Sequence, residues 1–241
     1  MKASGHYGTG SIWAVVPVKR LAHAKRRLSP VLSDAQRACL ALAMFRDLLQ
    51  TLTELRELAG IVVISSDPLV RSLARGSALL LEDAQEAGTN AAVGQAIRFL
   101  AARGHYDVMV MPSDIPFARA ADLRMALAAQ QDRAVVVASD RRGIGTNLLA
   151  GHGLHVMGTC FGDDSFRLHM DRICSAGLQP NILQSPGLRW DIDTPDDLRI
   201  DPRLICSPAG RRTLSLLERF SASGYVPTPG PELLAPMPPA W

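Results

Sequence analysis

The sequence is poor in cysteine and in aromatic residues, and both shortages exclude classes of protein. Only four cysteines occur among 241 residues, and no two of them form a C-x-x-C pair. Cysteines scattered in this way favour buried, reduced thiols over a disulfide framework. Aromatic residues make up 5% of the chain, and the formal net charge is only +3. This composition argues against a nucleic-acid-binding protein, which needs a basic stripe with interleaved aromatics.

Several catalytic and targeting motifs are also missing. The Walker A sequence G-x-x-x-x-G-K-[ST] does not occur, which excludes a P-loop ATPase, and neither does the dinucleotide fingerprint G-x-G-x-x-G. The hydrolase signature G-x-S-x-G is absent, and the six histidines are not at metal-ligand spacing. No run reaches the roughly 18 apolar residues of a membrane span. The polar start MKASGHYGTGS does not resemble a signal peptide, so we expect a cytoplasmic protein.

The remaining pattern is that of an α/β protein. Hydrophobic residues make up 47% and charged residues 20% of the chain, which suits a soluble globular domain. Near-continuous apolar runs alternate with helical patterns, and this rhythm predicts a mostly parallel sheet with helices on both faces. The expected strands are 12–16, 61–65, 78–81, 108–111, 134–138 and 188–192, and the expected helices include 69–75, 91–102 and 120–130.

Capping residues and composition set further boundaries. Ser33 and Gln36 form a capping box that predicts a helix start, and Thr194 followed by Pro195 predicts another. Residues 140–170 are rich in Gly, His and Asp and predict functional loops at one end of the sheet. We expect a flexible N-terminus over 1–11, one domain over 12–220, and a disordered Pro-rich tail over 221–241.

A basic loop directly follows the first expected strand. It carries Lys19, Arg20, Lys25, Arg26 and Arg27. Ligands of open parallel sheets bind outside the carboxyl ends of the strands, so this loop predicts a pocket for a polyanion. A solvated helix face is the alternative, and the position of the loop after a buried strand argues against it.

Three aspartates, here called the acidic trio, follow expected strands: Asp114, Asp191 and Asp193. Asp191 and Asp193 are two residues apart on an extended segment, so their side chains point to the same side. Together the trio could hold one Mg²⁺, whereas each aspartate alone could equally be a turn former or a helix cap. A basic loop beside a metal suits phosphoryl or nucleotidyl transfer, in which cations neutralise the transferring phosphate.

Seven motifs resemble one known family in order and approximate spacing. They are VPVKRLAHAKRRL, SSDP, GTNAA, MPSDIP, DRRGIGTNLL, FGDDSFRLH and WDIDTPDDL. Over roughly residues 12–200 the chain resembles the guanylyltransferases that load a phosphorylated three-carbon acid with GMP in coenzyme F(420) biosynthesis. The resemblance implies a Rossmann-like nucleotidyltransferase fold, a three-layer α/β/α arrangement around a mostly parallel sheet, shared with the molybdenum-cofactor guanylyltransferases.

The resemblance implies a GTP site around the basic loop. Lys19 and Lys25 would bind the phosphates and act as catalytic cations, with Arg27 in support. Gly88 and Asn90 would approach the base and ribose, since a glycine permits close backbone contact. Where the family has GLN, this chain has GTN from Gly88 to Asn90, a departure that bears on how guanine is recognised.

The resemblance also implies a metal and an acceptor pocket. The acidic trio matches the family's metal-binding acids, with Mg²⁺ as the expected cofactor and Asp114 as a catalytic residue. Thr146, Gly162 and Ser165 match the phospho-acid pocket, because hydroxyls and loop amides are suitable ligands for phosphate and carboxylate. Ordinary loop hydrogen bonding is the alternative for the two hydroxyls, and we expect His169 to be structural.

The expected reaction is transfer of GMP from GTP to a phosphorylated three-carbon acid, with release of diphosphate. The acid could be phosphoenolpyruvate, 3-phospho-D-glycerate or 2-phospho-L-lactate. Its phosphate is already an anion, so positioning and charge neutralisation would carry the rate without a strong base. Two alternatives remain open: transfer to a sugar phosphate or a molybdopterin, and a non-catalytic nucleotide-binding module. GTP and the acid are the expected partners, without nucleic acid or membrane, and a homodimer is one option for assembly.

Overall fold

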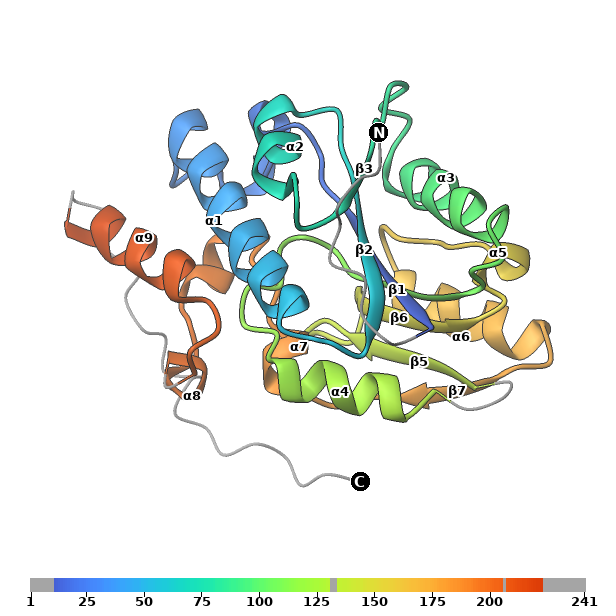
Figure 1. The fold of residues 1–241 in the computed structure, drawn as a ribbon. Helices are drawn as coiled ribbons and strands as arrows, with labels where there is room; N and C mark the ends of the chain where they lie inside the picture. The colour runs from blue at the N-terminus through green and yellow to red at the C-terminus, as the bar shows by residue number, and fades with distance from the viewer. Residues whose placement is uncertain (1–10, 131–133, 206, 223–241) are drawn as a thin grey trace.

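The computed structural model describes residues 11–130, 134–205 and 207–222 (Figure 1). Within them, seven strands form one sheet in the order β3-β2-β1-β4-β6-β5-β7. The strands are β1 Ile12–Pro17, β2 Leu58–Ile64, β3 Leu79–Leu81, β4 Asp107–Val110, β5 Ala134–Ser139, β6 Thr146–His152 and β7 Gln179–Ile182. The expected flexible N-terminus and the Pro-rich tail fall almost wholly on residues 1–10 and 223–241, outside the described residues.

All described strands except β6 run in one direction. β1 pairs in parallel with β2 and β4, whereas β6 is antiparallel to both β4 and β5. The apolar runs of the sequence are buried on both faces of the sheet, as the parallel arrangement requires. The mostly parallel α/β class predicted from the sequence is therefore confirmed.

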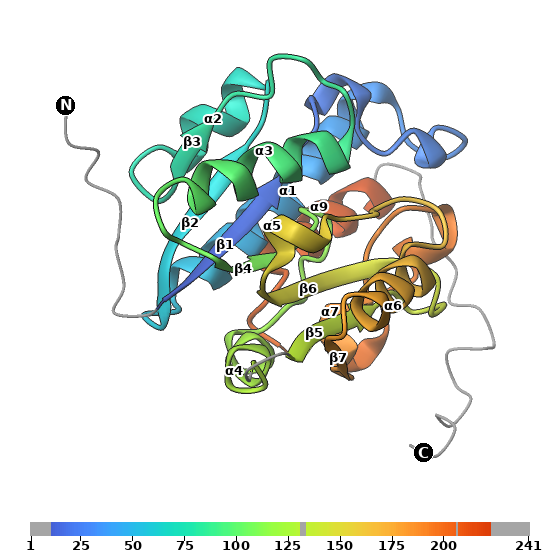
Figure 2. The ribbon, with the colours of Figure 1, turned by 90° about the vertical axis from the view of Figure 1, so that its right-hand side faces the viewer.

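Helices cover both faces of the sheet (Figures 1 and 2). One face packs against α1 Asp34–Thr53, α2 Pro68–Ala74 and α4 Ala120–Ala128, and α9 Arg211–Ala222 packs on the outer side of α1 (Figure 1). The other packs against α3 Thr89–Ala101, α5 Leu154–Met157 and α6 Ser165–Ser175. Short helices complete the described fold: η1 Leu21–His23, η2 Arg26–Leu28, α7 Pro186–Arg189, η3 Pro195–Leu198 and α8 Pro202–Ile205.

The start of α1 illustrates how local sequence fixes the fold. The Ser33 hydroxyl accepts from the Gln36 amide, and the Gln36 side chain accepts from the Ser33 amide, which is the predicted capping box. Phe45 and Leu48, on the inner face of α1, are fully buried against the sheet. Burying each such side chain contributes about 2 kcal/mol, so this face anchors α1 firmly behind the basic loop.

Two sequence predictions about the second half of the chain are wrong. Residues 140–170 are not loops throughout, because β6, α5 and the start of α6 lie within them. β6 escapes recognition because only Leu148–Ala150 form an apolar run, and glycines flank it. The segment 188–192 is not a strand: α7 ends at Arg189, and the following residues are irregular. Its apolar side chains, Leu188 and Ile192, are buried in the core without pairing in the sheet.

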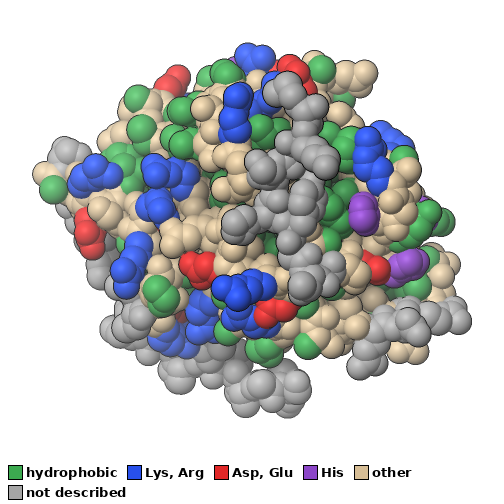
Figure 3. Space-filling view, viewed as in Figure 1, with side chains coloured by type: hydrophobic (Ala, Val, Ile, Leu, Met, Phe, Trp, Pro, Cys, Tyr) green, Lys and Arg blue, Asp and Glu red, His purple; other side chains and the backbone are tan. Residues whose placement is uncertain are grey.

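The described cysteines are free, as predicted, but not all are buried. Cys39 and Cys174 are exposed, because each lies on the outer side of its helix, and Cys160 is intermediate. No helix of the described residues has the length and apolarity to cross a membrane. On the face shown in Figure 3, Lys and Arg side chains are interspersed with Asp and Glu among the described residues.

Candidate active site

One edge of the sheet carries a cavity of about 820 Å³. The carboxyl ends of β1, β2 and β4 meet there, as in other open parallel sheets. Because β6 runs the opposite way, its amino end reaches the same edge. The cavity is lined by predicted site residues from both halves of the chain: Lys19, Lys25, Arg27, Gly88, Asp114, Thr146, Gly162, Ser165, Asp191 and Asp193.

The basic loop is fixed by the neighbouring strand β2. The Val18 amide donates to the Ile64 carbonyl at 2.9 Å, which extends the pairing of β1 with β2 into the loop. The Leu21 amide donates to the Asp67 carboxylate, also at 2.9 Å. Lys25 then adopts a left-handed backbone with φ 52°. This conformation costs a non-glycine residue free energy, and it turns the Lys25 side chain inward.

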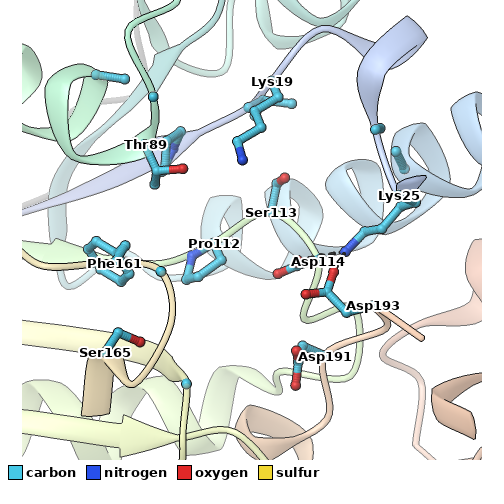
Figure 4. A pocket seen from close by; sticks show the side chains of 18 of the residues that line it. Lys19, Lys25, Thr89, Pro112, Ser113, Asp114, Phe161, Ser165, Asp191 and Asp193 are labelled. Atoms are coloured by element: carbon cyan, nitrogen blue, oxygen red, sulfur yellow. Dashed lines mark hydrogen bonds and ion pairs between the residues drawn. The ribbon is translucent and has the colours of Figure 1, made fainter. Parts of the chain in front are cut away.

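Lys25 lies between two members of the acidic trio (Figure 4). Its Nζ lies 2.6 Å from an oxygen of Asp114 and 2.6 Å from one of Asp193. Burial opposes the charged ammonium, but the two carboxylates outweigh it and raise the pKa of Lys25 far above its ordinary value. In Asp193 burial is likewise outweighed by Lys25, which lowers the pKa of that carboxyl. The ammonium is thus a permanent cation between two carboxylates.

Asp191, the third carboxyl group of the trio, forms no ion pair with a described residue. Burial, and then repulsion from Asp114 and Asp193, raise the pKa of Asp191 to about 7. Its Oδ1 accepts a 3.3 Å hydrogen bond from Asn147 on β6. The segments of the trio are joined directly, because the Ile192 amide donates to the Asp114 carbonyl at 3.2 Å.

The trio is brought together as predicted, but its present arrangement is an ion-pair cluster. Among the described residues, no group of three or more His, Cys, Asp or Glu side chains is placed to hold a metal ion. Lys25 occupies the space between two of the carboxylates. One oxygen of Asp114, Oδ1, is nevertheless buried without a hydrogen-bond partner in the described structure.

Two residues that shape the trio were not predicted. Asn147 holds both the Leu188 carbonyl and Asp191 through its side-chain amide. Asp197 accepts from the backbone amides of Asp193 and Thr194, at 3.1 and 2.7 Å. Asn147 lies beside Thr146 in the motif GIGTN. Because β6 was not recognised as a strand, the sequence did not indicate that the Asn147 side chain reaches Asp191. The capping pattern TPDD located Asp197 without revealing its contact with Asp193.

The cations other than Lys25 face the open part of the cavity. Lys19 is exposed and makes no hydrogen bond or ion pair with any described residue. Arg27 is 67% exposed at its side chain and lies 3.6 Å from Asp163. Gly88 precedes α3 with φ 99°, a conformation that favours glycine, and a Cβ added there would meet no atom within 4 Å. These three residues leave room and positive charge for a ligand.

Asn90 is placed differently from its prediction. It does not line the cavity, and its side chain is bound to the loop 158–164 across from α3. Asn90 Oδ1 accepts from the Phe161 amide at 2.7 Å and from Thr159 Oγ1 at 3.1 Å, while Nδ2 donates to the Phe161 carbonyl at 2.8 Å. Asn90 therefore braces this loop, and a direct contact with the nucleotide stays a prediction.

The predicted acceptor residues lie together beside the loop 158–164, which Arg27 of the basic loop also reaches through Asp163. Thr146 begins β6 and Ser165 begins α6, and both are almost fully buried. Gly162 lies between them in the loop 158–164 with φ 131°. The Thr146 hydroxyl lies 2.9 Å from Nδ1 of His169, a fully buried histidine on α6. Hydroxyls and loop backbone of this kind can surround a small anion.

We expect His169 to make the protein sensitive to acid. Burial, and then repulsion from Arg172, lower the pKa of His169 to about 4, from an ordinary value of 6.5. The unfolded chain therefore binds a proton first, and stability is lost as the pH falls from about 6.5 to 4. The loss amounts to about 2 to 3 kcal/mol. Urea unfolding at several pH values should show this loss in the wild type and a smaller one in His169→Gln; equal losses would contradict the assignment.

Comparison with known proteins identifies the family of this chain. The family model described as "Guanylyl transferase CofC like" matches residues 12–219. The phosphoenolpyruvate guanylyltransferase of Conexibacter woesei is 36% identical over 203 residues, 83% of this chain and 91% of that protein. The phosphoenolpyruvate guanylyltransferase of Roseiflexus castenholzii is 35% identical over 187 residues, 78% of this chain and 86% of that protein.

Solved structures agree on the fold. A protein from Desulfovibrio desulfuricans G20, assigned to the nucleotide-diphospho-sugar transferases, superposes with a TM-score of 0.70 at 21% identity, covering 89% of this chain and 96% of that one. A nucleotidyl transferase from Methanothermobacter superposes with a TM-score of 0.53 at 14% identity, covering 88% and 99%. The fold is thus that of a Rossmann-like nucleotidyltransferase, as predicted. The family match spans nearly the whole described chain, and the chain belongs to the CofC-like guanylyl transferases.

Proposed function

We propose that this guanylyltransferase transfers GMP from GTP to phosphoenolpyruvate and releases diphosphate. The observation that carries the proposal is that cations, carboxylates and hydroxyls line one cavity. Figure 4 shows Lys19 and Ser165 on different sides of this cavity, with the acidic trio on a third side. Arg27 reaches Asp163 in the loop 158–164. This arrangement suits a triphosphate, a reacting phosphorus and a second anion. Coenzyme F(420) biosynthesis is the proposed context.

In the proposed reaction the acceptor phosphate attacks the α-phosphorus of GTP in line, and diphosphate leaves. Lys19 and Arg27 neutralise the leaving phosphates. Thr146, Gly162 and Ser165 hold the acceptor so that its phosphate oxygen faces the α-phosphorus. The attacking oxygen already carries negative charge, so positioning and charge neutralisation supply most of the acceleration.

The acidic trio is the proposed Mg²⁺ site. Two observations fit a divalent cation: the buried Asp114 Oδ1 lacks a partner among the described residues, and burial with neighbouring charges raises the pKa of Asp191 to about 7. Both indicate negative charge that Lys25 alone does not compensate. When bound, Mg²⁺ would stabilise the charge that develops on the phosphate oxygens. Lys25 keeps Asp114 and Asp193 close together in the absence of the metal.

Phosphoenolpyruvate is favoured among the three acids because both relatives described above are named for it. The decisive experiment incubates the protein with GTP, Mg²⁺ and each acid separately, measures diphosphate release, and identifies the guanylylated product by mass. Highest kcat/KM with phosphoenolpyruvate supports the proposal. Preference for another of the three acids corrects the acceptor, and no diphosphate release with any of them overturns the function.

The cytoplasmic location and the homodimer remain predictions. Light scattering, which measures the mass of the particle in solution, tests the homodimer.

A prediction about Lys19 tests the orientation of the nucleotide. Lys19→Ala should raise the KM for GTP about tenfold, because an exposed cation contacting phosphate contributes about 1 to 2 kcal/mol. The KM for the acceptor should stay within about twofold, since Lys19 lies apart from Ser165 in the cavity (Figure 4). Steady-state kinetics with each substrate varied in turn measures both. A rise confined to the acceptor KM would reverse the proposed orientation.

A further inference from the structure

His169 is the one buried histidine of the described residues, and both of its ring nitrogens are engaged. It projects from α6 between β6 and the loop 158–164. Its Nδ1 lies 2.9 Å from the Thr146 hydroxyl, and its Nε2 lies 2.9 Å from the backbone amide nitrogen of Cys160. The Phe161 ring packs edge-on against the imidazole, with the ring centroids 4.9 Å apart. The imidazole thus bridges the two sides of the acceptor end of the cavity.

These contacts determine which nitrogen of His169 carries the proton. A backbone amide can only donate, so Nε2 must accept from Cys160 and cannot itself be protonated. Burial and Arg172 keep the ring neutral, and a neutral imidazole has one N–H. The proton therefore resides on Nδ1, which donates to Thr146 Oγ1 and has the Ser165 carbonyl as a second acceptor.

The direction of this bond decides what the Thr146 hydroxyl can do. Its oxygen accepts from His169, so its own hydrogen is not used in that bond. This hydroxyl makes no other hydrogen bond with the described residues, and Thr146 lines the cavity. The hydroxyl is therefore presented to the cavity as a donor, and an anionic acceptor would take that hydrogen bond.

The Nε2 side of the imidazole holds the loop 158–164, which faces Thr146. The Cys160 amide is held by Nε2, while the next residue, Phe161, is held by Asn90 through its amide and its carbonyl. Gly162, a predicted acceptor residue, follows directly. The separation between Thr146 and this loop is thereby set by one rigid ring and not by flexible side chains.

We propose that His169 is a positioning residue for the acceptor: it orients the Thr146 hydroxyl as a donor and holds the loop 158–164 opposite it. The proposal rests on the proposed function, since the acceptor is the anion that the cavity end would bind. It gives His169 a role beyond the structural one expected from the sequence.

Two substitutions separate the two hydrogen bonds. The amide of a glutamine reaches the place of Nε2, so His169→Gln can still accept from Cys160 but cannot donate to Thr146. The amide of an asparagine lies near the place of Nδ1, so His169→Asn can still donate to Thr146 but releases the Cys160 amide. The two variants therefore act as controls for each other, with similar size and no charge.

We expect His169→Gln to raise the KM for phosphoenolpyruvate about tenfold, because the acceptor loses about one hydrogen bond to a charged group. The KM for GTP should stay within about twofold of the wild-type value. His169→Asn should recover most of the acceptor KM, while hydrogen exchange at the Cys160 amide becomes faster in that variant only. Adding Thr146→Val to His169→Gln should cause little further change, because both remove the same donor.

Thr213→Val controls for lost stability. Thr213 is fully buried against Asp47 on α1, where its hydroxyl and amide bind that carboxylate. Its loss should lower the free energy of unfolding without changing the acceptor KM selectively. If His169→Gln behaves like Thr213→Val, or raises both KM values equally, the positioning role is overturned.

The assignment of the His169 proton to Nδ1 can also be tested without measuring enzyme activity. ¹⁵N NMR of labelled histidine should show a neutral His169 with its proton on Nδ1 at neutral pH, and a proton on Nε2 would overturn the proposal. If the wild-type protein forms no guanylylated product, the proposed function fails and the acceptor role falls with it. If product forms and His169→Gln leaves the acceptor KM unchanged, only the role of His169 fails.

Discussion

Asp114→Asn is expected to lower the kcat of guanylyl transfer by at least about 100-fold. The substitution keeps the shape of the side chain but removes a negative charge from the centre of the cavity. Asp114 pairs with Lys25 at 2.6 Å, and its second oxygen is buried without a partner in the described structure. An amide can neither balance Lys25 nor serve as a strong ligand for a divalent cation. Diphosphate release at saturating GTP and phosphoenolpyruvate measures the effect.

GTP binding by Asp114→Asn, followed by calorimetry, distinguishes catalysis from simple nucleotide binding. We expect affinity within about threefold of the wild type in the absence of metal, since the phosphates bind toward Lys19 and Arg27. Asp196→Asn is the matched control, because Asp196 is exposed, lies in the segment of the trio and pairs only loosely with Arg199, at 3.7 Å. It should retain nearly full activity. Equal losses of activity in the two variants would show that Asp114 has no specific part in the reaction.

Lys25→Met is expected to lower the free energy of unfolding by about 2 to 3 kcal/mol. The side chain of Lys25 is only 8% exposed, and its removal leaves Asp114 and Asp193 facing each other without a cation. The loss is smaller than for a fully buried pair because Asp193 is 41% exposed and can be solvated. Urea unfolding without divalent metal measures it. Mg²⁺ should stabilise this variant more than the wild type, because the metal replaces the missing charge.

The pH dependence of the Lys25→Met deficit has a definite sign. Despite burial, Lys25 lowers the pKa of Asp193 below its ordinary value of 3.8, so this ion pair stabilises the wild type above that pH and loses its effect below it. The deficit should therefore shrink as the pH falls below about 4. Lys19→Met is the control: its exposed side chain has no ion pair with described residues, and its stability should change by less than about 0.5 kcal/mol. A deficit that grows with acid would contradict the ion-pair arrangement.

Local patterns in the sequence were sufficient for the first half of the fold. The apolar run before Lys19 is β1, and the capping box at Ser33 opens α1 as predicted. The convergence of Asp114 with Asp191 and Asp193 was also predicted, although the expected strand 188–192 does not form and an irregular segment after α7 brings the last two to the sheet edge. Periodicity and caps depend on neighbouring residues, so they can be recognised without knowing the tertiary structure.

The partners of individual side chains were not predictable in this way. Lys25 and Asp193 are 168 residues apart in the chain, and nothing local indicates that they form an ion pair. Asn147 and His169 act through β6 and α6, in the region 140–170 that the sequence indicated as loops. Asn90 matches a nucleotide-binding motif, yet its amide braces the loop 158–164. Tertiary contacts between distant segments decide each of these cases.

The reversed strand β6 divides the cavity between two halves of the chain. Residues before the middle of the chain, from β1 to the start of α3, supply the cations and the glycine that would receive the nucleotide. Residues from β6 onward supply Thr146, Gly162 and Ser165 for the second substrate. The two halves meet at Lys25 with Asp193 and at Asn90 with the loop 158–164, so substitutions elsewhere in the second half leave the residues of the nucleotide end unchanged. In evolutionary terms, such a fold can exchange one small acid for another while its use of GTP stays constant.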